Sequence, residues 1–256
     1  MITIAVKVVK VYNLTIRDFC DLFKEVCEML KCVPIMAIKL EEAVNLVGEL
    51  ANKDCDYIEW RIDTLDDKIK PELLAKAWNN MKELTDKPII VTLRTTSQGG
   101  KARLSISQYN QVIRKLIDII HMDYLDVEIT TCGGDARAKM FAKMAAQRNI
   151  KTILSYHDIQ YTTSARDIEM MLCRLKYIGA DIPKVAYTAN NMEDVENLKE
   201  GALKAHKVIG DLVAISMGEL GKETRVNGDE IGSVINYTKP IGTAVQASDD
   251  LGQIEL

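Results

Sequence analysis

Short runs of apolar, often β-branched residues alternate along this chain with longer segments in which apolar residues recur at helical spacing. The short runs predict eight strands, at residues 34–38, 57–62, 89–93, 124–129, 152–155, 184–187, 213–217 and 242–245. The longer segments predict helices that include 41–51, 71–84, 135–148, 164–178 and 192–206. This repeat predicts parallel strands that are joined by helical crossovers.

The number of repeats decides between two parallel folds. Eight strand and helix units, each of roughly 30 residues, are what a (β/α)8 TIM barrel requires, so we expect an α/β protein of this kind. An open doubly wound sheet is the alternative, but no G-x-G-x-x-G sequence follows the first predicted strand. Because no Pro/Gly/Ser-rich linker interrupts the chain, we expect residues 1–256 to form one barrel domain.

The first 32 residues do not fit the repeat. Residues 2–11 resemble a strand, and one helical face of residues 15–31 carries the apolar side chains Phe19, Leu22, Phe23, Val26 and Leu30. We expect residues 1–32 to form a strand and helix cap on the barrel bottom, and residues 33–256 to form the barrel. A helix packed on the side of the ring is the alternative.

Composition narrows the classes of function. The formal net charge of −4 gives no reason to expect a nucleic-acid partner or an acidic membrane surface. No signal peptide is visible, and no segment approaches the ~18 apolar residues of a membrane span. Six scattered cysteines without a C-x-x-C pair predict no zinc site and fit a reducing compartment. We expect a cytoplasmic protein without a bound metal.

TIM-barrel enzymes carry their chemistry at the carboxyl ends of the strands. The polar residues within or just after the predicted strands are Glu59, Arg61, Asp63, Arg94, Asp126, Glu128, His157, Asp158, Lys184, Arg225, Ser248 and Gln253. We expect these side chains to meet at one mouth of the barrel.

Lys184 is the most informative of them. Burial among other cations would lower its pKa and leave a neutral amine that attacks a ketone to form an imine. His157 stands alone among three histidines at the end of a predicted strand, one strand before the lysine, and would suit proton transfer to the same centre. The alternatives are a structural, ion-paired lysine and a core histidine.

Three arginines point to the ligand. Arg61, Arg94 and Arg225 can bind carboxylates in bidentate fashion, which favours a small anionic oxo-acid as substrate. The alternative is that each arginine pairs with a nearby acid such as Glu59 or Asp63.

Several sequence blocks occur in one order at barrel spacing. They are D-Y-I-E-W-R-I-D at 56–63, Arg94 with Gly99-Gly100, D-V-E at 126–128, S-Y-H-D at 155–158, I-P-K-V-A at 182–186, and Met217 with Arg225. From about residue 33 to the end, the chain resembles the type I 3-dehydroquinate dehydratases.

The resemblance implies a hydro-lyase of the shikimate pathway, and so of aromatic amino acid biosynthesis, that converts 3-dehydroquinate to 3-dehydroshikimate without metal or cofactor. It implies that Lys184 forms the Schiff base and that His157 is the general acid/base. The implied substrate-binding residues are Glu59, Arg61, Arg94, Met217, Arg225, Ser248 and Gln253, and the supporting residues are Gln98, Asp126 and Glu128. Because family members are often dimers, a homodimer is also implied.

Three departures from the family pattern bear on activity. Gln98 replaces the glutamate that pairs with the histidine, so we expect a lower pKa of His157 and weakened turnover. The last loop, 247–253, is one residue longer, and Asp249 and Asp250 would oppose lid closure over an anionic substrate. The resemblance also implies a final helix that covers strand eight, which we do not expect in this chain, so residues 15–31 or a partner subunit could fill the apolar groove.

Two other classes of function stay open. A class I aldolase or another imine-forming lyase would use the same barrel and lysine, although it would not require these blocks together. A non-catalytic barrel that binds a shikimate-pathway acid is the second, and Gln98 with the altered lid is its best support.

Overall fold

The computed structural model of this chain describes residues 29–66 and 70–246. Its strands are β1 (Leu30–Ile35), β2 (Tyr57–Arg61), β3 (Ile89–Thr92), β4 (Tyr124–Glu128), β5 (Lys151–Asp158), β6 (Ile182–Thr188), β7 (Val213–Met217) and β8 (Ile235–Tyr237). Its α-helices are α3 (Leu40–Leu50), α4 (Pro71–Leu84), α5 (Ile106–Ile119), α6 (Asp135–Ala146), α7 (Ala165–Ile178), α8 (Met192–Ile209), α9 (Lys222–Val226) and α10 (Thr243–Gln246). Short 3-10 turns are η1 (Ile62–Thr64), η2 (Thr96–Gln98) and η3 (Gly228–Ile231).

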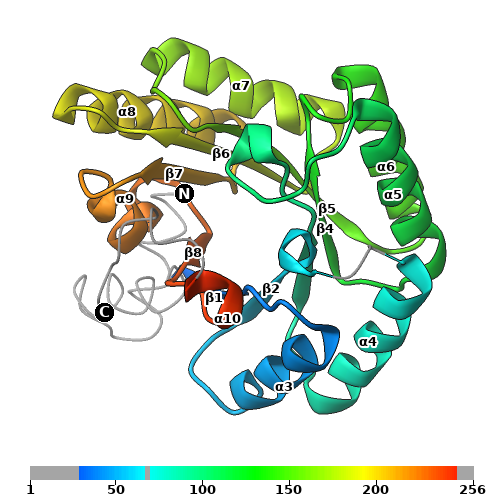
Figure 1. Cartoon of the computed structure of the whole chain (residues 1–256). Coiled ribbons are helices and arrows are strands. Elements are labelled where there is room, and N and C mark those ends of the chain that lie inside the picture. Colours follow the sequence, from blue (N-terminus) through cyan, green and yellow to red (C-terminus); the bar gives the residue numbers. More distant parts are fainter. Residues whose placement is uncertain (1–28, 67–69, 247–256) are drawn as a thin grey trace, which may run out of the picture.

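The strands form one parallel sheet in the order β7-β6-β5-β4-β3-β2-β1-β8. The two outer strands approach each other, because Leu212 and Ser233 form a parallel bridge just before β7 and β8. Figure 1 shows the ring of strands with the large helices α3 to α8 outside it. The predicted (β/α)8 TIM barrel is therefore confirmed, and the open doubly wound sheet is excluded.

The helices begin where the sequence provides caps. Ser105 and Gln108 form a capping box at the start of α5, a helix that our sequence analysis did not name. Ser164 accepts a hydrogen bond from the Asp167 backbone at the start of α7, and Pro71 opens α4. These caps fix the helix starts outside the ring.

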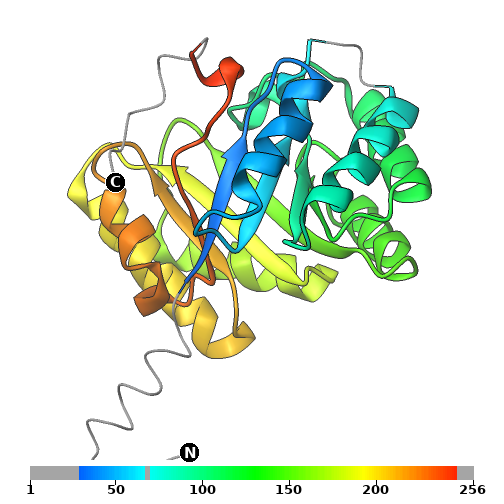
Figure 2. The same ribbon diagram turned by 90° about the horizontal axis from the view of Figure 1, so that it is seen from below.

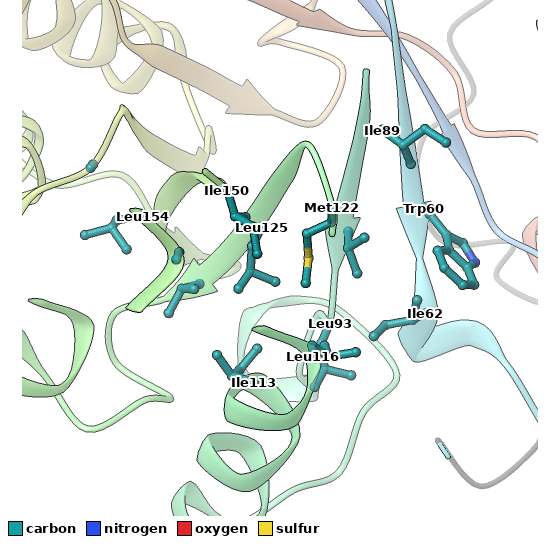
Figure 3. Packing of buried hydrophobic residues seen from close by; sticks show 14 of the residues in the cluster. Trp60, Ile62, Ile89, Leu93, Ile113, Leu116, Met122, Leu125, Ile150 and Leu154 are labelled. Carbon is teal, nitrogen blue, oxygen red and sulfur yellow. The ribbon is translucent and has the colours of Figure 1, made fainter. Parts of the chain in front are cut away.

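The strand residues alternate between two environments. On β4, Leu125 and Val127 face outward into the main hydrophobic core between strands and helices. Figure 3 shows part of this core, with Ile113 and Leu116 of α5 close to the strand residues. Tyr124 belongs instead to a small apolar cluster inside the barrel, with Cys32, Ile90, Ile153, Val213 and Ile235. Asp126 and Glu128 follow Tyr124 on the same face, so the barrel interior changes from apolar to charged toward its carboxyl end.

Our prediction of strand eight at 242–245 is wrong. The strand is β8, three residues long, and Ile235 and Tyr237 pair in register with Leu30 and Cys32 of β1. Residues 242–245 lie in a turn and in α10 instead, because Gly242 has a φ of 117° that favours glycine. A strand of three residues gives too short an alternation to stand out in the sequence.

The first strand also begins earlier than predicted. Leu30 and Lys31 belong to β1, so the predicted helix over 15–31 is wrong at its carboxyl end. The same leucine fits a helical face and a strand, which is why periodicity alone misplaced it. The rest of the predicted N-terminal cap and the predicted lid lie outside the described residues.

Helix α10 is attached to the carboxyl end of the barrel. The Glu42 carboxylate, in the first turn of α3, accepts hydrogen bonds from the backbone N–H and the hydroxyl of Thr243, each at 2.7 Å. Figure 2 shows α10 beside the start of α3. The chain therefore reaches residue 246 at the same end of the barrel as the charged interior. No described helix is long and apolar enough to cross a membrane.

Candidate active site

Lys184 lies in the middle of β6 with its side chain inside the barrel. Its residue is 3% exposed, and its Nζ is 3.7 Å from Asp126 Oδ2 and 3.9 Å from Glu59 Oε1. The ring of Tyr237, on β8, lies below the same nitrogen at 3.8 Å from its centroid. The amine is therefore held from three sides, by β2, β4 and β8.

Opposing effects set the pKa of Lys184. Burial lowers it, the carboxylates of Glu59 and Asp126 raise it, and the charge of Arg94 lowers it again. The net result is a pKa below the ordinary value for lysine. The fraction of molecules in which Lys184 is a neutral amine near pH 7 is therefore larger than for an ordinary lysine. The neutral amine is the form that attacks a carbonyl carbon.

Arg94 occupies the centre of a network of buried charges. Its guanidinium donates to Asp126 Oδ2 at 2.7 Å, to Glu128 Oε1 at 3.2 Å and to Ser155 Oγ at 3.0 Å. Burial would raise the pKa of Asp126, but Arg94 and Lys184 hold it below its usual value. Asp126 is therefore ionised, and it links the arginine to the lysine. We call Lys184, Glu59, Asp126, Arg94 and Glu128 the deep network.

His157 lies on β5, beside β6 and nearer the mouth. The sheet register places Ser155 opposite Lys184 and His157 opposite Ala186, so the histidine is two residues further along than the lysine. Burial lowers the pKa of His157 well below its usual value, and the charges of Arg94, Lys184 and Arg61 lower it further. The imidazole is therefore neutral near pH 7 and available as a base.

Gln98 fixes which nitrogen of His157 can act. Its Oε1 accepts a hydrogen bond from the backbone N–H of His157 at 2.7 Å and lies 3.2 Å from Nδ1. Its Nε2 donates to the Thr130 hydroxyl at 2.8 Å. Because an amide oxygen only accepts, the proton of the neutral ring belongs on Nδ1, and Nε2 carries the free electron pair.

A tight loop brings Gln98 to this position. Gly100 lies so close to Arg94 that a Cβ would be 2.1 Å from the carbonyl oxygen of that arginine. Gly99 has a φ of 82°, which favours glycine. The Gly99-Gly100 pair therefore turns the chain back just after η2 and points the preceding glutamine at β5.

The three predicted anion-binding arginines differ in their partners. Arg61 forms a bidentate ion pair with Asp63, with both hydrogen bonds at 2.8 Å, and Arg94 belongs to the deep network. Arg225, on α9, donates to the carbonyl oxygens of Ser216 and Gly218, at 2.8 Å and 3.1 Å. Among the described residues, no carboxylate lies within ion-pair distance of Arg225, and its Nε has no partner.

The remaining predicted residues divide into two groups. Glu59 accepts a hydrogen bond from the Thr92 hydroxyl at 2.8 Å, and Met217 ends β7 opposite Thr188. Ser248 and Gln253 lie outside the described residues. In the described part of the chain, no group of three or more His, Cys, Asp or Glu side chains could hold a metal ion.

The sequence did not lead us to three residues that contact the charged groups of the site. Ser155 donates to Asp126 at 2.6 Å, and Thr95 donates to Glu128 at 2.6 Å. Ser155 was detectable, because it precedes His157 by two residues and therefore shares its face of β5. Tyr237 was missed because strand eight was misplaced.

Comparisons with known proteins identify the family of this chain. The family model described as type I 3-dehydroquinase matches residues 31–256. The 3-dehydroquinate dehydratase of Alkaliphilus oremlandii is 32% identical over 234 residues, which cover 90% of this chain and 88% of the relative. That of Salmonella typhimurium is 31% identical and covers 79% of each chain.

Solved structures lead to the same family. The 3-dehydroquinate dehydratase of Enterococcus faecalis has a TM-score of 0.77 at 28% identity and covers 82% of this chain and 88% of its own. The type I enzyme of Clostridium difficile, solved with covalently modified comenic acid, has a TM-score of 0.76 at 26% identity and covers 82% and 83%. This chain belongs to the type I 3-dehydroquinase family.

Proposed function

We propose that this chain is a hydro-lyase that converts 3-dehydroquinate to 3-dehydroshikimate and water through an imine on Lys184. The observation that carries the proposal is the buried amine of Lys184 beside two carboxylates, with His157 on the next strand. Membership of the type I family supports the reaction and its place in the shikimate pathway, and it counts against the aldolase and the non-catalytic barrel.

The reaction begins at the lysine amine. The neutral Nζ of Lys184 attacks the C3 ketone of the substrate, and loss of water from the carbinolamine gives a protonated imine. That cation withdraws electrons from C2 and makes its hydrogen acidic. Asp126 and Glu59, each within 4 Å of Nζ, stabilise the positive charge as it forms.

His157 carries the proton. Its Nε2 removes the C2 hydrogen to give an enamine, and the imidazolium then donates the proton to the C1 hydroxyl, which leaves as water. A second water hydrolyses the imine, which frees Lys184 and releases 3-dehydroshikimate. One water enters and two leave, so the sum is the loss of one water from the substrate.

Gln98 makes the second half of this cycle harder. An amide oxygen orients the ring as a carboxylate would, but it does not neutralise the imidazolium that forms after C2 deprotonation. We expect turnover to be weakened and not abolished, because formation of the imine does not require a charged histidine.

The substrate carboxylate binds Arg225 in this proposal. Among the described residues, the partners of its guanidinium are carbonyl oxygens and no acid, whereas Arg61 and Arg94 are already neutralised by acids. Met217, Ser248 and Gln253 would complete the binding site. A homodimer and a cytoplasmic location stay predictions.

Borohydride trapping tests the covalent step directly. Incubation with 3-dehydroquinate and borohydride should reduce the imine and leave an adduct on the peptide that carries Lys184, detected by mass spectrometry. His157→Ala is the matched variant, because it should still give the adduct while losing turnover. An unmodified Lys184 in the wild-type chain would contradict the proposal.

A further inference from the structure

Tyr237 contacts the Nζ of Lys184, although the mechanism proposed above does not use it. It is the last residue of β8, opposite Cys32 in the register, and the Nζ of Lys184 lies over its ring at 3.8 Å from the centroid. A cation at this distance over an aromatic face is attracted by the ring electrons, and more strongly so where water is excluded.

The hydroxyl of Tyr237 also points to contact with a ligand, independently of the ring. Its Oη is buried and has no hydrogen-bond partner among the described residues. A buried hydroxyl without a partner is unfavourable, so it is more stable when a ligand oxygen binds to it. Burial raises the pKa of Tyr237 well above its usual value, and the nearby charge of Glu59 raises it further. The hydroxyl therefore keeps its proton and acts as a donor.

We infer that Tyr237 is a further catalytic residue. Its ring face stabilises the positive charge on Lys184 and on the imine formed there, and its hydroxyl donates a hydrogen bond to an oxygen of the bound substrate. This inference rests on the proposed imine at Lys184, and it adds a neutral group to the acids that hold the cation.

The two parts of the side chain make separable contributions. The ring acts on the lysine in the free enzyme, because attraction to the face favours the ammonium and raises its pKa relative to an aliphatic neighbour. The hydroxyl acts only when substrate is present. Removing the hydroxyl should therefore alter substrate binding, whereas removing the ring should also alter the titration of Lys184.

Tyr237→Phe and Tyr237→Leu separate these contributions. Tyr237→Phe should raise KM about fivefold, as expected for one lost neutral hydrogen bond, and leave the titration of Lys184 unchanged. Tyr237→Leu should raise KM similarly and also lower the pH midpoint of Lys184 by about one unit. The midpoint is measured by pH-dependent acylation of Lys184, followed by peptide mass spectrometry.

The controls make each outcome decisive. Tyr57→Phe removes another hydroxyl from the barrel interior, one that bonds Tyr124, and should leave KM unchanged. A wild-type KM in Tyr237→Phe would overturn the role of the hydroxyl. Equal midpoints in Tyr237→Phe and Tyr237→Leu would overturn that of the ring, with Tyr237→Met replacing the leucine variant if the latter does not fold. Borohydride trapping of the wild-type chain in the same series reports separately on the imine itself.

Discussion

The deep network and the pair of His157 with Gln98 lie side by side in one barrel, but they differ in the charge of the groups beside the lysine and the histidine. In the deep network, two cations face three carboxylates, all of them almost completely buried. The histidine has a neutral amide as its partner on Nδ1. Carboxylates therefore offset part of the cost of a buried positive charge at the lysine, whereas no carboxylate does so at the histidine.

This difference matches the order of the proposed steps. The imine on Lys184 must be cationic to acidify the substrate, and the adjacent carboxylates favour that state. The histidine must first be neutral to accept a proton and then cationic to return it. Gln98 favours only the first of these two states, so the deep network is better matched to the reaction than the histidine pair.

Removal of the amine should have the largest effect. Lys184→Met keeps the length of the side chain but cannot form an imine, so we expect kcat to fall by about 10⁴-fold or more. The assay is the absorbance of the conjugated product. Thermal unfolding is the control for folding, because the change removes a buried cation near two carboxylates. Substantial turnover by a folded variant would exclude covalent catalysis at this position.

Removal of the base should have the next largest effect and should separate the two regions. We expect His157→Ala to lower kcat by about 10²- to 10⁴-fold, which is the usual contribution of general acid/base catalysis. Borohydride trapping should still label Lys184, because the deep network is unchanged. Loss of both turnover and labelling would mean that the histidine is also needed to form the imine.

The arginines provide a similar contrast with a smaller effect. Arg225→Ala should raise KM about 10- to 100-fold with a lesser change in kcat, since it removes a charge-assisted bond to the substrate carboxylate. Arg61→Met is the matched comparison. Because Asp63 already neutralises Arg61, that variant should affect the thermal unfolding temperature more than KM. A larger rise in KM for Arg61→Met would reverse our assignment of the carboxylate site.

The sequence predicted the barrel and the composition of its mouth, but it left open which arginines are paired with acids. Strand alternation placed Glu59, Asp126 and Lys184 at one end, because the carboxyl ends of parallel strands meet there. It did not distinguish Arg94, which pairs with buried carboxylates, from Arg225, whose partners among the described residues are backbone carbonyls. Pairing depends on side-chain reach across neighbouring strands, which spacing along the chain does not encode.

The position of Tyr237 shows a second limit. β8 has three residues, so its local pattern is weak. Its partner β1 is also remote in the sequence, near the other end of the chain. The ring of Tyr237 lies beside Lys184 because β8 pairs with β1. By contrast, the contact between Gln98 and His157 was implied by the resemblance to the family, in which a glutamate at this position pairs with the histidine.

Gln98→Glu should have the smallest effect and tests the contrast most directly. A neutral His157 is needed as the base, so kcat/KM should fall as the pH drops through its pKa, and the lowered pKa places this loss below about pH 6.5. The introduced carboxylate favours the imidazolium and should move the acidic limb upward by about one pH unit. Donation of the C1 proton then becomes easier, and kcat should rise by about three- to tenfold.

The geometry allows this exchange without a new clash. Thr130 now accepts a hydrogen bond from the Gln98 amide, and its hydroxyl can rotate to donate to a carboxylate oxygen. Thr130→Val in the Gln98→Glu background is the control, because it removes that donor and should reverse part of the gain. If Gln98→Glu shifts the pH profile but leaves kcat unchanged, then release of water from C1 is not a slow step, and the neutral histidine pair does not limit the enzyme.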